Sequence, residues 1–130
     1  MSSNDLKALV ENAERAITSR DFDRLMMFYA DDAALVVRPG LVVSGKEKIL
    51  RAWQSMSVLF DNGLNVRRGE MEVLEGGGTA LVLMETALEF VSPEGYEVST
   101  THRATYTFRK DKNRWLCAID NSYGTALLDG

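Results

Sequence analysis

The sequence contains one cysteine and one histidine among its 130 residues, and these two shortages exclude several kinds of site. A single cysteine, Cys117, cannot form a disulfide within the chain, which fits a reducing compartment. Zinc sites built from histidines and cysteines need three or four such ligands, and Cys117 and His102 cannot supply them. We therefore expect a protein without a metal site and without a cofactor.

Long apolar runs and a surplus of basic residues are also missing. No apolar run approaches the roughly 20 residues that cross a bilayer, and the first residues, MSSNDLKAL, lack the basic segment and apolar core of a secretory signal. The formal net charge of −4 argues against nucleic acid, because binding phosphates needs a concentrated basic face. We expect a cytoplasmic protein that binds neither membranes nor nucleic acid.

What is present is an ordinary globular composition, with 45% hydrophobic and 26% charged residues. A chain of this length buries about two thirds of its unfolded surface, so one hydrophobic core suffices. We expect a single domain spanning residues 1–130.

The spacing of apolar residues predicts two helices at the start of the chain. From residue 4 to residue 19 apolar side chains recur every three or four positions, which places them on one helical face. Asn4 is the expected N-cap of this helix. Asp21 is the expected N-cap of a second, shorter helix that reaches Tyr29. The two helices would form an N-terminal hairpin.

A short β-hairpin and a third helix are expected next. The apolar run from Ala33 to Val37 is short and rich in β-branched valine, which favours a strand, and Pro39-Gly40 turns the chain back. Ser44 and Glu47 have the spacing of a capping box at the start of the third helix. This helix is expected to end at residues 61–63, which read Asp-Asn-Gly.

From residue 66 onward the signals are those of strands and turns. Short turn sequences separate four segments, which predicts an antiparallel meander, with a bulge at Gly69 in its first strand. Alternation in the second and third strands predicts one buried face. Its residues are Val82, Met84, Thr86, Leu88, Phe90, Thr100, His102, Ala104, Tyr106 and Phe108.

The opposite face of this meander is polar but rich in threonine, as in a sheet surface that is paired with something. Three helices can cover only one face of such a sheet. We therefore expect a homodimer formed through the outer face of the sheet.

Several short motifs, together with the order of the elements, resemble the nuclear transport factor 2-like superfamily. The motifs are Asp21-Phe22-Asp23, Tyr29-Ala30-Asp31-Asp32-Ala33, Pro39-Gly40, Gly45-Lys46-Glu47 with Ile49, and the tail from Trp115 to Gly124. The first four are similar to polyketide cyclase-like (SnoaL-like) and ketosteroid isomerase-like members. The tail resembles the small stand-alone branch related to the calcium/calmodulin kinase II association domain.

This resemblance implies an α+β fold of the cystatin-like class. In this fold three N-terminal helices pack on a curved, mainly antiparallel sheet and close it into a cone. The open end of the cone would admit a small ligand that is apolar or of mixed polarity.

The same resemblance argues against the reaction of the steroid isomerases. Those enzymes use a tyrosine and an aspartate to bind the enolate and a second aspartate to move the proton. The corresponding positions hold Ala13, Ala104 and Val37, which carry no polar side chain. Two functions stay open: a cofactor-independent isomerase, cyclase or hydratase-like enzyme, and a non-catalytic dimeric binding or assembly module.

The predicted ligand pocket draws on the helices, the first strand and the meander. Its expected residues are Tyr29, Val37, Trp53, Met56, Phe60, Met84, Thr86, Phe90, His102, Ala104, Tyr106 and Asn121. His102 is the candidate catalytic group because an imidazole titrates near neutral pH. The alternative is a partly buried histidine bonded to a neighbouring hydroxyl or carboxylate.

Asp120 and Asn121 are neighbours on the last strand, so they point to opposite faces and only one can reach the pocket. Alternation along the strand places Asn121 inside and Asp120 outside, near Arg103. A bulge would exchange the two, and Asp120 would then become a carboxylate partner of His102.

Overall fold

The computed structural model describes residues 3–60 and 63–129, without the side chains of Ser3, Asn4 and Phe60. Three predictions fall outside the described residues: Asn4 as an N-cap, Phe60 as a pocket residue, and Asp61-Asn62 as the end of the third helix.

Six strands of the described chain form one sheet in the order β2-β1-β6-β5-β4-β3. The last four make the predicted antiparallel meander, while β1 pairs in parallel with β6 and antiparallel with β2. The sheet is therefore mainly antiparallel, as predicted. The strands are β1 (Tyr29–Arg38), β2 (Leu41–Ser44), β3 (Leu64–Gly76), β4 (Thr79–Val91), β5 (Glu97–Asp111) and β6 (Arg114–Asn121).

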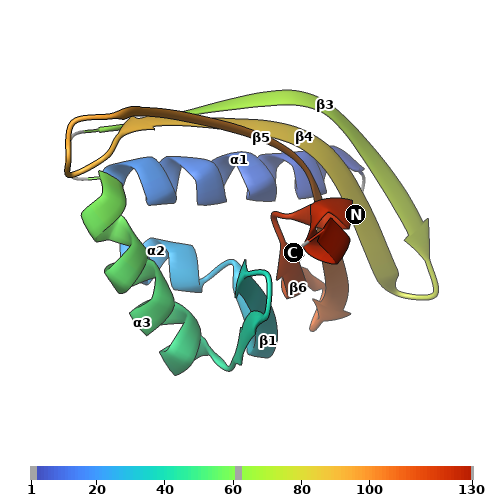
Figure 1. Cartoon of the computed structure of the whole chain (residues 1–130). Coiled ribbons are helices and arrows are strands. Elements are labelled where there is room, and N and C mark those ends of the chain that lie inside the picture. The colour runs from blue at the N-terminus through green and yellow to red at the C-terminus, as the bar shows by residue number, and fades with distance from the viewer. Residues whose placement is uncertain (1–2, 61–62, 130) are drawn as a thin grey trace.

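The helices lie on one side of this sheet. Figure 1 shows the long strands β3, β4 and β5 arching over α1, α2 and α3. This arrangement confirms the predicted fold of three N-terminal helices on a curved sheet. The helical elements are α1 (Ser3–Ser19), α2 (Phe22–Met26), α3 (Lys46–Met56), the short 3-10 helix η1 (Ser57–Phe60) that continues α3, and a C-terminal 3-10 helix η2 (Gly124–Asp129).

The core lies between α1 and the concave face of the sheet. Along α1, Leu6, Val10 and Ala13 are buried at the helical spacing that the sequence predicted. They belong to one cluster with Val82 and Phe108 from the sheet. Burying a side chain such as Leu6 contributes about 1.5–3 kcal/mol, so this packing fixes the helix against the sheet.

The second helix ends earlier than the sequence predicts. Helix α2 stops at Met26, and Tyr29 begins strand β1 instead of closing the helix. The cause is a pairing with a distant segment: Tyr29 lies beside Cys117 of β6, and the Cys117 N–H donates to the Phe28 carbonyl at 2.9 Å. This pairing directs the Tyr29 side chain into the core, where it is 1% exposed.

The predicted capping box at the start of α3 is wrong. Gly45, with a φ of +92°, is the N-cap and makes no side-chain capping bond. Ser44 is one residue too early because it pairs with Ala34 as the last residue of β2. The predicted cap of α2 is confirmed, since the Asp21 side chain accepts a hydrogen bond from the Arg24 N–H at 3.2 Å.

The meander has the predicted bulge and buried face. The β3–β4 register shifts between Arg68 and Met71, around Gly69. On β4, Val82 and Met84 are buried on the concave side, while the alternate Leu81 and Leu83 are exposed on the outer side.

Candidate functional site

A bulge in β6 places a carboxylate on the concave face. Across β5 and β6, Thr107 lies opposite Ile119, whereas the next residue, Phe108, lies opposite Cys117, so Ala118 is the extra residue. Cys117 and Asp120 are consequently both buried, and Ile119 between them is 47% exposed. The alternative with a bulge is therefore the correct one for Asp120, and its predicted outward position is wrong.

Asp120 is held by hydroxyl groups and has no cationic partner in the described part of the chain. The Tyr29 hydroxyl donates to Oδ2 of Asp120 at 2.6 Å, and the Ser122 hydroxyl donates to Oδ1 at 3.3 Å. The Trp53 indole N–H donates to the Tyr29 hydroxyl oxygen at 3.1 Å. Helix α3 is thus connected to the carboxylate of β6 through a residue of β1.

Burial controls the protonation of these groups. It raises the pKa of Asp120 to about 6 from an ordinary value of 3.8, although the hydrogen bonds from Tyr29 and Ser122 lower it. Burial, and then the charge of Asp120, raise the pKa of Tyr29 well above its ordinary value of 10.0. The same two causes raise the pKa of Tyr106. The site therefore combines a carboxyl group that titrates near neutral pH with two phenols that stay protonated.

The space beside Asp120 is small. A cavity of about 20 Å³ is bounded by Tyr29, Tyr106, Asp120 and residues of α1 and α2. Such a volume has room for about one water molecule. Met84 is buried in the core, and Trp53 and Met56 pack against that core. A metabolite does not fit beside Asp120 in this arrangement of side chains.

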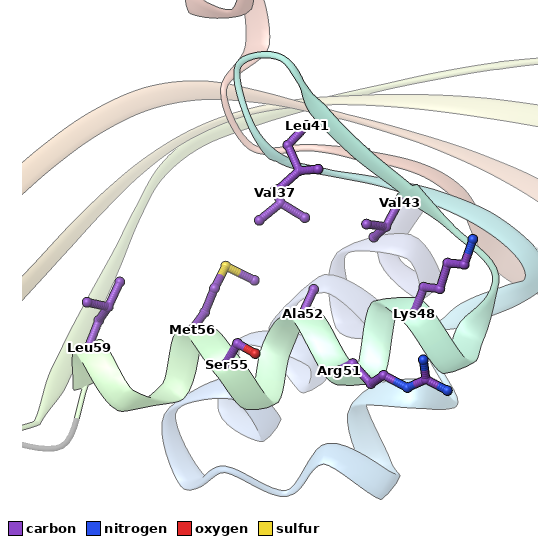
Figure 2. Close-up of a pocket in the computed structure, with 9 residues that line it drawn as sticks. All are labelled: Val37, Leu41, Val43, Lys48, Arg51, Ala52, Ser55, Met56 and Leu59. Carbon is purple, nitrogen blue, oxygen red and sulfur yellow. The ribbon is translucent and has the colours of Figure 1, made fainter.

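A ligand-sized groove of about 550 Å³ lies on the other side of α3, between that helix and the β1–β2 hairpin. Its volume is within the range of small-molecule sites. Figure 2 shows Val37, Leu41 and Val43 of the hairpin facing Ala52 and Met56 of α3 across the groove. Trp53 follows Ala52 on α3, so a single helix contributes to the groove and to the hydrogen-bonded network around Asp120.

The structure divides the predicted pocket residues into groups. Tyr29 and Tyr106 lie at the small cavity, Val37 and Met56 line the groove, and Trp53 connects the two regions. The remaining predicted residues on β4 and β5 that are buried or partly buried are Met84, Thr86, Phe90, His102 and Ala104.

The predicted pairing of His102 with Asp120 does not form. The ring of His102 lies 5.3 Å from that of Tyr123, whose hydroxyl donates to the Val37 carbonyl at 3.3 Å. A catalytic role for His102 stays a prediction.

Asn121 binds the backbone of the turn after β6. Its Oδ1 accepts from the N–H groups of Tyr123 and Gly124 at 3.2 and 3.1 Å, and its Nδ2 donates to the Gly124 carbonyl at 3.2 Å. Asn side chains commonly make such hydrogen bonds to the backbone in turns. The prediction that Asn121 rather than Asp120 supplies the inward polar group is wrong, because the bulge at Ala118 reverses the alternation.

Sequence reasoning missed Ser122 as a partner of Asp120, and Lys48, Arg51 and Ser55 as groove residues. The three groove residues carry a signal, because they recur at spacings of three and four on α3 and so share one helical face. Ser122 carries none, since its contact depends on the bulge.

The acidic pair Asp31-Asp32 forms ion pairs. Lys46 lies 3.4 Å from Asp31, and Arg109 lies 2.6 Å from Asp32. The hydrogen bond from Arg109 lowers the pKa of Asp32. Within residues 3–60 and 63–129 no three His, Cys, Asp or Glu side chains gather as ligands for a metal ion. In the same residues no helix combines the length and the apolar character that a membrane span requires.

Comparison with known proteins identifies the family. The sequence model of the SnoaL-like domain matches residues 6–118. No curated protein matches the chain.

Solved structures share its fold at low sequence identity. Aln2 from a Streptomyces species has a TM-score of 0.83 at 15% identity, over 98% of this chain and 93% of that one. An NTF2-like protein with a cystatin-like fold from Novosphingobium aromaticivorans has a TM-score of 0.80 at 18% identity, over 97% and 88%. The association domain of CaMKII from C. elegans has a TM-score of 0.70 at 16% identity, over 91% and 92%. With a family match over most of its length, the chain belongs to the SnoaL-like domain family.

Proposed function

We propose that this protein binds a small, mostly apolar molecule and moves a proton on it without a cofactor, with Asp120 as the acid–base group. The observation that carries the proposal is the position of Asp120, which is 3% exposed and bound by the Tyr29 hydroxyl at 2.6 Å. An ionised carboxylate buried without a cation costs several kcal/mol. Groups with pKa values perturbed in this way gather at functional sites, which supports a role beyond folding.

The chemistry that fits these groups is proton transfer next to a carbonyl. The ionised Asp120 would remove a proton from the carbon beside the carbonyl, and the bonding electrons would move onto the carbonyl oxygen. A phenol that stays protonated, Tyr29 or Tyr106, would donate a hydrogen bond to that oxygen. If a double bond is conjugated with the enolate, return of the proton from Asp120 to the far carbon of that system completes an isomerisation. Attack of the enolate on a second carbonyl of the same molecule closes a ring, and the alkoxide that forms takes the proton from Asp120, which completes a cyclisation.

Access to Asp120 would depend on Trp53. The cavity beside Asp120 is too small for a substrate, whereas the groove on the far side of α3 has the volume of one. Trp53 is partly buried, and one hydrogen bond, to Tyr29, holds its indole ring. We infer that a ligand in the groove displaces this ring and so reaches the carboxylate.

Solvent deuterium exchange tests the proposal without knowledge of the natural substrate. A panel of small cyclic and aryl ketones is incubated with the protein in deuterated buffer, and loss of the proton beside the carbonyl is followed by NMR. We expect the wild type to accelerate exchange of at least one ketone, and Asp120→Asn to reduce the rate roughly a hundredfold or more. The matched control is Asp32→Asn, which alters an exposed carboxylate on the same sheet and should leave the rate unchanged. Equal rates for Asp120→Asn and the wild type would refute the proposal.

We infer as a second candidate that the chain is a non-catalytic binding or assembly module that dimerises through the outer face of the sheet. The observation in its favour is a set of exposed apolar side chains there, with Leu81, Leu83 and Ile119 exposed by 36%, 39% and 47%. Apolar residues that gather on one face of a sheet are typical of a contact with another protein. Absence of exchange with every ketone, together with a stable dimer, would favour this candidate.

A further inference from the structure

We propose that the groove between α3 and the β1–β2 hairpin binds an elongated amphipathic anion, with the acidic head at Lys48 and Arg51 and the apolar tail toward Met56 and Leu59. This inference rests on the proposed function only in taking the groove as the ligand site. It does not require that Asp120 be catalytic.

The groove is charged at one end and apolar elsewhere. Figure 2 shows Lys48 and Arg51 at one end of the groove and Leu59 at the other, with Met56 between them. The side chains along the remaining walls are almost all aliphatic, from Val37, Leu41, Val43 and Ala52. A ligand that satisfies both ends must itself have a charged head and an apolar body.

The two cations are available to a ligand. The carboxylate beside Arg51 is Glu47 at 3.8 Å, and both side chains are largely exposed, at 70% and 88%. Such a pair contributes little and is easily exchanged for another anion. Lys48 forms no ion pair in the part of the chain that the structure describes. The positive end of the groove therefore lacks a strong internal counter-ion.

The length of the groove favours a chain-like ligand. Leu59 lies eleven positions after Lys48, which corresponds to a rise of about 18 Å along α3 and η1. An extended medium-chain acyl tail has a length of this order. Lys48, Arg51 and the nearby Glu47 together carry a net charge of about +1, so a head with one negative charge matches this end of the groove better than the several phosphates of a nucleotide do.

Calorimetric titration with ten-carbon ligands tests this inference. Decanoate, decanol and decyltrimethylammonium are titrated below the concentrations at which they form micelles, and the affected residues are located by amide NMR shifts. We expect decanoate to bind most tightly of the three. Its affinity should fall as the salt concentration rises, because the contact with its head group is electrostatic. Lys48→Met and Arg51→Met should each raise the dissociation constant of decanoate roughly threefold and change that of decanol by less than about twofold. Arg24→Met removes the same charge from exposed α2 and should change neither.

Two further variants separate the possible failures. Ala52→Trp fills the groove and should abolish binding of decanoate and decanol alike. If decanoate and decanol bind equally and the cation variants behave as the wild type, the anionic head is refuted and the groove remains a ligand site. If no ligand binds and Ala52→Trp instead changes the oligomeric mass, the groove is a contact between copies, and the inference is refuted. Asp120→Asn should bind decanoate as the wild type does, whether or not it has lost the proton-transfer activity.

Discussion

The carboxyl group of Asp120 is costly to keep ionised where it lies. Its two oxygens receive hydrogen bonds from Tyr29 and Ser122, but no cation lies within ion-pair distance among the described residues. A structural carboxylate in such a position is usually paired, because hydroxyl donors replace only part of the hydration that is lost. An apolar residue at this position would destabilise the folded state less than an ionised carboxylate does. The presence of Asp120 here therefore favours a chemical role.

The stability of the protein should record this cost as a function of pH. The pKa of Asp120 is about 6 in the folded protein, against about 3.9 in an unfolded chain, so the folded state holds the proton more tightly. The stabilisation from this group is complete below about pH 4 and is lost as the pH rises to about 6. A difference of about two units between the folded and unfolded pKa values corresponds to about 3 kcal/mol of folding free energy over the whole titration. Because an unfolded aspartate is already about half ionised at pH 4, the free energy of unfolding of Asp120→Asn should rise by about 2 kcal/mol relative to the wild type between pH 4 and pH 7.

Urea denaturation of both proteins at four pH values, at one protein concentration, measures this difference. Asp32→Asn is the control with the opposite sign, because Arg109 lowers the pKa of that exposed carboxyl group. The Asp32 variant should gain no stability relative to the wild type as the pH rises. Parallel curves for Asp120→Asn and the wild type would show that Asp120 titrates as an ordinary aspartate.

Among the elements, those set by local pattern could be predicted and those set by distant pairing could not. The apolar spacing of α1 and the alternation of β4 are contained in a few neighbouring residues, and both are confirmed. The change from helix to strand at Tyr29 depends on pairing with Cys117, which is 88 residues away. The inward turn of Asp120 depends on the extra residue Ala118, and no local signal marks it. The fold could thus be predicted, whereas the partners of its central carboxylate could not.

The turn from β6 into η2 depends on one glycine. Gly124 has a φ of +56°, and a Cβ at this position would collide with the carbonyl oxygen of Arg103 on β5. Gly77, in the β3–β4 turn, has nearly the same φ of +59° but open space around it. The two positions therefore share the backbone conformation and differ in the contact.

Replacing each glycine by alanine separates the two effects. Gly77→Ala should lower the free energy of unfolding by about 1 kcal/mol, from the left-handed backbone alone. Gly124→Ala should cost roughly 1 to 3 kcal/mol more, because the backbone of β5 or η2 must also move. Urea denaturation of the two variants measures the difference. Equal losses would mean that η2 moves away from β5 without cost.

At the scale of the whole molecule, the helices leave one face of the sheet without cover. Figure 1 shows α1, α2 and α3 on the concave side of the long strands. On the outer side, the strand register aligns Leu74, Leu81, Thr107 and Ile119 in one row across β3, β4, β5 and β6. Three of these four residues are exposed aliphatic side chains. An exposed apolar row of this kind lowers the solubility of a monomer. In a dimer whose two sheets pack face to face, the same row would form the apolar centre of the interface.

We expect this row to be the centre of a symmetric dimer. In a two-fold symmetric interface both subunits use the same surface, so residues near the axis contact their own copies in the partner. Sedimentation equilibrium of the wild type at micromolar concentration should give twice the mass of the chain. Leu81→Glu, in the middle of the row, should raise the dissociation constant roughly tenfold or more, since the dimer would bury two like charges close together. Leu128→Glu, on η2, alters a side chain that is 89% exposed and should leave the mass unchanged. If the wild-type protein sediments as a monomer, the dimer prediction is wrong. The row is then exposed to solvent, and the sheet packs against other elements on its concave face alone.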